Sequence, residues 1–111
     1  MVSMTEVAST TRPLGGPTGR LVTAHRGELC AVFERHGVTN PKIFGSVARG
    51  EDRPGSDVDI LVDFPPGTGL FAIAQMQAEL EDLLGVSVDL VPTAGLKPVV
   101  RADVEPDLIA L

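Results

Sequence analysis

The spacing of apolar residues along the chain predicts an alternation of helices and strands. Apolar residues recur at near-helical spacing over residues 20–36, and Gly37 stands where a helix commonly ends. Helical spacing returns over residues 69–84 and stops at Gly85. Short apolar runs bounded by turn residues predict strands at 41–44, 57–63 and 87–91. This order predicts an α/β fold, with a small mixed β-sheet and helices packed mainly on one face.

The two ends of the chain lack a sustained apolar period. Residues 1–19 mix Ser, Thr, Gly and Pro, which predicts a flexible N-terminal tail. The remaining residues, 20–111, are expected to form a single domain. Near the other end, Pro98 and Pro106 leave room for one short helix before a loosely attached terminus.

Composition narrows the function classes. The 111 residues include no Trp or Tyr and only four Phe, so the core must be aliphatic. A formal net charge of -6 repels a nucleic-acid backbone, and the chain has no basic stripe or aromatic platform, so no direct nucleic-acid partner is expected. Cys30 is the only cysteine, and no long apolar run or signal peptide is found, which predicts a cytoplasmic protein without membrane attachment.

Two aspartates one residue apart are the first candidates for chemistry. In a strand, Asp57 and Asp59 lie on one face, roughly 6.5 to 7 Å apart at their α-carbons. Two carboxylates so placed suit magnesium, which also takes oxygens from substrate phosphates and water. A bound metal–nucleotide complex is compatible with the acidic net charge. The alternative is a pair of solvated carboxylates at a strand end.

A glycine-serine turn upstream predicts the phosphate side of the same site. Gly45 lets the backbone approach an oxyanion, and Ser46 adds a hydroxyl where a helix is expected to start. Arg49 and Ser56 flank the loop, and an arginine can donate two hydrogen bonds to a phosphate. For Arg49 the alternative is an ion pair with a nearby acid.

Asp89, in the third predicted strand, is the remaining candidate. A neighbouring strand could bring its carboxylate to the same metals, although polar residues also protect sheet edges. Three carboxylates around two metal ions fit an in-line displacement at phosphorus, in which an acceptor hydroxyl attacks and pyrophosphate leaves. The residues therefore predict nucleotidyl transfer, with Asp89 orienting the acceptor hydroxyl.

Taken together, these motifs resemble a known family. The segments GSVARG at 45–50, SDVDI at 56–60 and VDL at 88–90 are similar to the minimal nucleotidyltransferase domain of the polymerase-beta-like superfamily. The resemblance runs from about residue 20 to residue 97. It implies that Gly45 and Ser46 contact a triphosphate. It further implies that Asp57 and Asp59 hold Mg²⁺ and that Asp89 is the third catalytic carboxylate.

The same resemblance implies a partner. Many stand-alone members of this family are antitoxins encoded beside a helical HEPN-domain ribonuclease toxin, and some silence the toxin by transferring AMP from ATP to one of its tyrosines. A short chain with little acceptor-binding surface fits that role. Two alternatives stay open: an antitoxin that acts by binding alone, and a nucleotidyltransferase whose acceptor is a small molecule or an RNA end.

Overall fold

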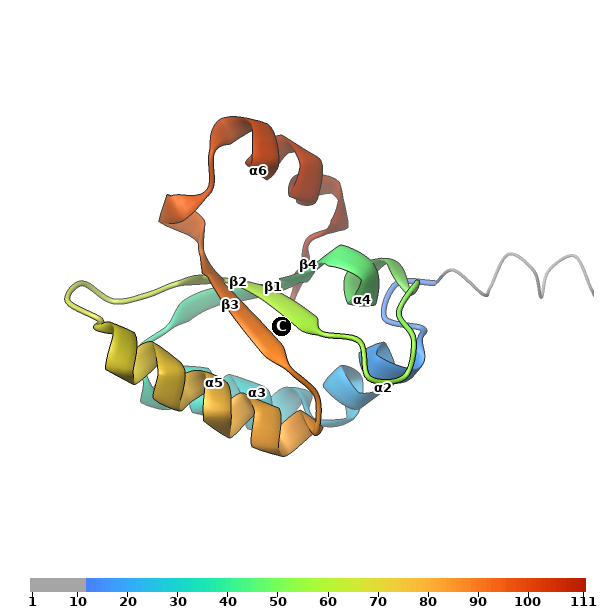
Figure 1. Cartoon of the computed structure of the whole chain (residues 1–111), viewed down its shortest axis with the longest axis horizontal. Coiled ribbons are helices and arrows are strands. Elements are labelled where there is room, and N and C mark those ends of the chain that lie inside the picture. The colour runs from blue at the N-terminus through green and yellow to red at the C-terminus, as the bar shows by residue number, and fades with distance from the viewer. Residues whose placement is uncertain (1–11) are drawn as a thin grey trace, which may run out of the picture.

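The computed structural model describes residues 12–111, which form a four-stranded sheet with helices around it (Figure 1). The elements are α2 (Pro17–Ala24), α3 (Arg26–Arg35), β1 (Thr39–Phe44), α4 (Gly45–Arg49), β2 (Val58–Asp63), α5 (Leu70–Leu84), β3 (Val88–Pro92), the 3-10 helix η1 (Thr93–Gly95), α6 (Pro98–Val104), the 3-10 helix η2 (Glu105–Asp107) and β4 (Ile109–Ala110).

The sheet is mixed, as the apolar pattern predicts. Its strands lie in the order β3-β2-β1-β4, with β2 and β3 parallel and the other neighbours antiparallel. The parallel pair is joined through α5, since parallel neighbours need a crossover connection. The α/β fold class, the mixed sheet and the helix ending at Gly85 are all confirmed.

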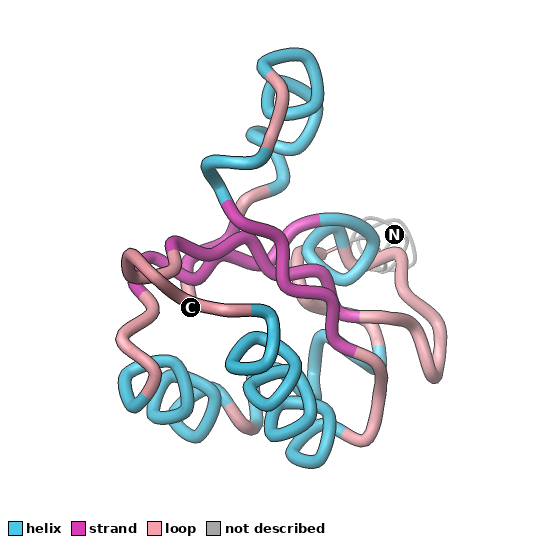
Figure 2. The backbone as a smooth tube through the Cα atoms, turned by 60° about the vertical axis from the view of Figure 1, so that its left-hand side comes forward, coloured by secondary structure: helices cyan, strands magenta, loops and turns pink. Residues whose placement is uncertain are grey.

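Helices α3 and α5 cover one face of the sheet (Figures 1 and 2). On β2, the side chains of Val58, Ile60 and Val62 point toward these helices and are fully buried. They alternate with Asp59 and Leu61, which point to the opposite face because successive residues of a strand alternate in direction. The helix-covered face of the sheet thus holds the aliphatic core.

The opposite face, called here the open face, is approached by α6. Figure 2 shows α6 standing away from the strands, on the side that α3 and α5 do not occupy. None of the residues of α6 is buried. The open face therefore borders a helix that contributes nothing to the core.

The first predicted helix, over residues 20–36, is divided into two. His25 ends α2 and precedes α3, with φ -106° and ψ 15°, which is not helical geometry. The bend lets Val22 of α2 and Leu29 of α3 both reach the core, where each is fully buried. Core packing thus decides the break, which an apolar pattern alone does not mark.

The N-terminal helix also begins earlier than the predicted boundary at residue 20. Thr18 and Gly19 lie buried in α2, and their backbone N–H groups donate to Asp52 Oδ2 at 2.7 Å and 3.2 Å. A carboxylate from a distant loop therefore caps this helix, so residues 17–19 are corrected from tail to folded domain. Just before α2, the N–H of Leu14 donates to the carbonyl oxygen of Ala48 at 3.2 Å, so residue 14 is also attached to the domain. The part of the tail prediction that covers residues 1–11 lies outside the described residues.

The prediction of a loosely attached C-terminal end is wrong. Strand β4 pairs with β1, and the N–H of Leu111 donates to the carbonyl oxygen of Pro41 at 3.0 Å. The guanidinium of Arg26 donates to the carbonyl oxygen of Ala110.

Within residues 12–111, every helix is too short or too polar to cross a lipid bilayer.

Candidate active site

The parallel strands bring two of the predicted carboxylates side by side. In the register of β2 and β3, Asp59 pairs with Asp89, and neighbouring strands lie about 4.8 Å apart. Their sequence neighbours Val58 and Val88 face the core, so both aspartates face the open side of the sheet. Asp57 comes one residue before β2 begins. The sheet therefore gathers the predicted acidic residues at one end of its open face.

Asp59 is the carboxylate most affected by this crowding. Partial burial, and then the charges of Asp89 and Asp57, raise the pKa of Asp59 above its ordinary value of 3.8. Asp57 and Asp89 are themselves exposed. A half-buried carboxylate beside two other acids is a place where a cation would relieve repulsion.

These carboxylates suit magnesium in kind, but they are not a complete cage. Within residues 12–111, no three His, Cys, Asp or Glu side chains gather closely enough to hold a metal ion. Magnesium in proteins is commonly held by one or two carboxylates, with substrate phosphates and waters as the remaining ligands. The oxygen donors therefore fit an ion that arrives with a nucleotide.

Gly45 lies against this carboxylate group. It begins α4 with φ +80°, and a Cβ at this position would lie 2.7 Å from Asp59 Oδ2. A side chain here would therefore meet both backbone strain and a collision. The buried side chains of Val47 and Ala48 anchor α4, which keeps Gly45 beside Asp59, and the next residue, Ser46, is partly exposed.

Arg49 and Ser56, the other two predicted nucleotide ligands, are already engaged within the protein. Arg49 donates from Nε to Glu51 Oε1 and from Nη1 to Asp107 Oδ2, each at 2.9 Å, and these bonds raise its pKa further above its ordinary value. Ser56 Oγ accepts a hydrogen bond from the backbone N–H of Arg53 at 2.8 Å, which closes the turn before β2. Their contacts with nucleotide stay predictions.

Asp63 lies on the same face of β2 but apart from the other aspartates. Its Oδ2 accepts a hydrogen bond from Asn40 Nδ2 at 3.1 Å. This bond, the nearby Thr93 hydroxyl and the charges of Lys42 and Arg101 lower the pKa of Asp63. Asp63 is thus satisfied by its neighbours, whereas Asp59 is crowded by acids.

Two residues that shape the site region are absent from the sequence motifs. Asp52 caps α2, and Asp107 binds Arg49 across a separation of 58 residues. For Arg49, the sequence offers the nearby Glu51 as a partner, and the structure includes that pair. The pairing with Asp107 depends on how the C-terminal residues fold back, and no local sequence pattern predicts that path.

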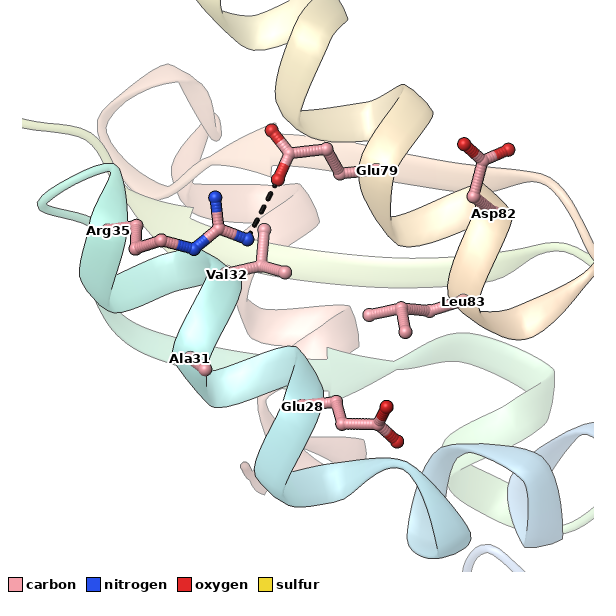
Figure 3. Close-up of a pocket in the computed structure, with 7 residues that line it drawn as sticks. All are labelled: Glu28, Ala31, Val32, Arg35, Glu79, Asp82 and Leu83. Carbon is pink, nitrogen blue, oxygen red and sulfur yellow. Dashed lines mark hydrogen bonds and ion pairs between the residues drawn. The ribbon is translucent and has the colours of Figure 1, made fainter.

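A separate hollow lies between α3 and α5, on the helix-covered side (Figure 3). It has a volume of about 470 Å³, with Val32 and Leu83 among its lining residues. Glu79 crosses it to bind Arg35 Nη2 at 2.9 Å and His36 Nε2 at 3.1 Å. The sheet separates this hollow from the three aspartates, so it is not part of their site.

Comparison with known proteins agrees with the geometry. The model of the nucleotidyltransferase domain family matches residues 26–111. Protein adenylyltransferase MntA of Thermococcus cleftensis is 47% identical over 77 residues, which are 69% of this chain and 75% of the relative.

Solved structures share the fold. A protein assigned as a minimal nucleotidyltransferase superposes with a TM-score of 0.72 at 43% identity, over 81% of this chain and 92% of that chain. A toxin–antitoxin crystal structure with AMP-PNP superposes with a TM-score of 0.66, over 76% of this chain and 69% of that chain, and its 21% identity supports the fold alone. The minimal nucleotidyltransferase resemblance found in the motifs is confirmed. This chain belongs to the nucleotidyltransferase domain family.

Proposed function

We propose that this nucleotidyltransferase transfers AMP from Mg²⁺-ATP to a hydroxyl of a toxin protein and thereby neutralises it. The observation that carries the proposal is the in-register pair of Asp59 and Asp89 beside the close-packed Gly45. The name of the Thermococcus relative, a protein adenylyltransferase, supports AMP as the transferred group and a protein as the acceptor. The toxin–antitoxin structure with AMP-PNP, a fold neighbour, makes a toxin the first partner to test.

Each site residue has a distinct task in this proposal. Asp57 and Asp59 would hold magnesium together with phosphate and water oxygens, and Asp89 would orient the acceptor hydroxyl beside it. The backbone at Gly45 and the hydroxyl of Ser46 contact the triphosphate. Magnesium, when bound, neutralises phosphate charge and makes pyrophosphate a better leaving group.

The reaction balances without any further reagent. The acceptor oxygen forms a bond to the α-phosphorus of ATP as the bond between the α-phosphorus and the bridging oxygen to the β-phosphate breaks. Pyrophosphate leaves, and the hydroxyl proton passes to Asp89 or to water. Within this scheme the finer proposal is that the acceptor is a tyrosine of a HEPN-domain ribonuclease, as the motif resemblance implies.

Intact-mass spectrometry of a candidate toxin, taken from the reading frame next to the gene of this protein, tests the proposal. After incubation with this protein, ATP and magnesium, we expect the toxin mass to rise by one or more AMP units. The Asp57→Asn/Asp59→Asn variant should leave the mass unchanged. Asp63→Asn is a matched control, because it removes the same charge from the same strand face at a residue outside the site. Peptide mapping of the product then identifies the modified side chain.

A second candidate function is neutralisation by binding alone. It is favoured by the incomplete metal cage, since no three ligand side chains converge within the described residues 12–111. Under this alternative, an Asp57, Asp59 and Asp89 triple Asn variant still neutralises the toxin in cells as well as wild type does. Loss of neutralisation by the triple variant, with the complex still formed, supports the enzymatic function.

A further inference from the structure

Residues 98–107, called here the C-terminal arm, form α6 and η2. The arm has no buried residue, and it stands on the open face, the face that also carries Asp59 and Asp89 (Figures 1 and 2). A helix without buried side chains gains little from packing. Its position therefore depends on how its two ends are attached.

The two ends of the arm are attached differently. Before the arm, the Thr93 hydroxyl donates to the carbonyl oxygen of Val62 at 3.2 Å, which holds η1 to the end of β2. At the other end, Asp107 Oδ2 accepts from Arg49 Nη1 at 2.9 Å, and η2 lies against α4 and β1. The second attachment joins the arm to the helix that begins at Gly45.

The geometry of Arg49 suits it to this attachment. It is the last residue of α4, so its backbone is held by the same short helix that places Gly45 beside Asp59. Its planar guanidinium binds Glu51 through Nε and Asp107 through Nη1. Glu51 thereby fixes the direction in which the guanidinium is presented to Asp107.

We propose that Arg49 is a positioning residue that fastens the C-terminal arm, through Asp107, to α4, the helix that begins with the glycine-serine turn, and so shapes the side of the site that receives the acceptor protein. This deepens the proposed function and rests on it. The expected acceptor surface is apolar where it meets the arm, because Val99 and Val100 of α6 are 75% and 40% exposed. The arm is then a contact for the protein whose hydroxyl is modified.

Steady-state kinetics with separate variation of ATP and toxin test the proposal. Asp107→Asn should raise KM for the toxin about 2- to 5-fold, the range typical of an exposed ion pair, with KM for ATP unchanged. Arg49→Gln should raise KM for the toxin by the same factor, because it removes the same ion pair. The double variant should be no worse than either single variant, since both remove one interaction. Asp103→Asn is the control, because it removes an equal charge from an exposed residue of the same arm.

Two outcomes overturn the proposal. If Arg49→Gln raises KM for ATP while Asp107→Asn behaves as wild type, Arg49 acts on the nucleotide directly. If both variants retain wild-type KM values for both substrates, the attachment has no role in acceptor recognition.

Binding and hydrogen exchange separate failure of this inference from failure of the proposed function. If wild type transfers no AMP but binds the toxin, the proposed function fails. The inference is then judged by Kd: about 2- to 5-fold weaker toxin binding by Asp107→Asn than by Asp103→Asn supports it, and equal binding overturns it. Amide exchange over residues 98–107 should also be faster in Asp107→Asn and Arg49→Gln than in wild type. Unchanged exchange means that the ion pair does not hold the arm, which contradicts the inference.

Discussion

The two faces of the sheet are built from alternate residues of the same strand, yet they have opposite physical character. On the helix-covered face, Val58, Ile60 and Val62 are fully buried in an aliphatic core. On the open face, Asp59 is only half-buried and has other acids beside it. One face is arranged for stability and the other tolerates repulsion, so substitutions one residue apart should separate folding from activity.

The largest expected effect comes from removing a carboxylate on the open face. Asp59→Asn removes a proposed metal ligand and a charge from a crowded group, so AMP transfer should fall by at least about 100-fold. The free energy of unfolding should stay level or rise, because the repulsion from Asp89 and Asp57 is relieved. Transfer assays and urea unfolding on the same preparation measure both quantities. Retained activity contradicts the assignment of Asp59 to the site.

The next largest effect comes from leaving a cavity on the helix-covered face. Ile60→Ala, at the residue that follows Asp59, leaves a cavity in the core and should lower the free energy of unfolding by about 2–5 kcal/mol. Activity per folded molecule should remain close to wild type at low temperature. Urea unfolding gives the first value, and transfer rates corrected for the folded fraction give the second. A specific loss of activity in folded protein would show that the two faces are not separable.

A smaller effect is expected from adding a side chain at Gly45, which lies against Asp59 of the open face. Gly45→Ala places a Cβ at φ +80° and 2.7 Å from Asp59 Oδ2, so it should cost about 1–3 kcal/mol of stability and also reduce transfer. Gly27→Ala is the matched control, because a Cβ there meets nothing within 4 Å. Gly27→Ala should be neutral or should stabilise by up to about 1 kcal/mol. Equal behaviour of the two alanines, by thermal unfolding, contradicts the close approach at Gly45.

The smallest expected effect is a difference in how pH changes the stability contributed by two carboxylates of the open face, Asp59 and Asp63. The raised pKa of Asp59 means that the native state binds its proton more readily than the unfolded chain does. Its contribution to stability is therefore lost as the pH rises from the ordinary aspartate range through the raised pKa. The lowered pKa of Asp63 has the opposite sign, so that contribution is lost as the pH falls through the lowered value.

Urea unfolding across the acid range, with EDTA present, measures this difference. As the pH rises, wild type should become less stable relative to Asp59→Asn. The change should be less than about 1 kcal/mol, because Asp59 is only half-buried. Over the same rise in pH, wild type should become more stable relative to Asp63→Asn. Slopes of the same sign for the two variants would contradict the contrast between a crowded and a satisfied carboxylate.

Much of the fold could be predicted because its signals are local. The helix over 70–84 has apolar residues at helical spacing and a glycine directly after it, which takes φ +73°. Strand β2 is a short apolar run between turns, and the glycine-serine and aspartate motifs lie directly in the sequence. The pairing of Asp59 with Asp89 also follows once two strands are taken as neighbours.

The elements that escaped prediction depend on distant contacts. The break at His25 lets two segments reach one core, and the capping of α2 needs Asp52 from another loop. The two-residue strand β4 carries too little pattern to be distinguished from a loop. Asp107, a partner of Arg49 that is 58 residues away in the sequence, reaches it because of the path of the arm and not because of any local spacing.

The short strand β4 has a consequence for the order of events during synthesis. Strand β1 pairs on one side with β2, and on the other with β4, where Leu111 N–H reaches the carbonyl oxygen of Pro41. While the ribosome is still translating residues 64–108, β1 therefore keeps one edge of unpaired backbone groups, which is the kind of edge that recruits other chains. The last residues of the sheet to be translated are the ones that close this edge.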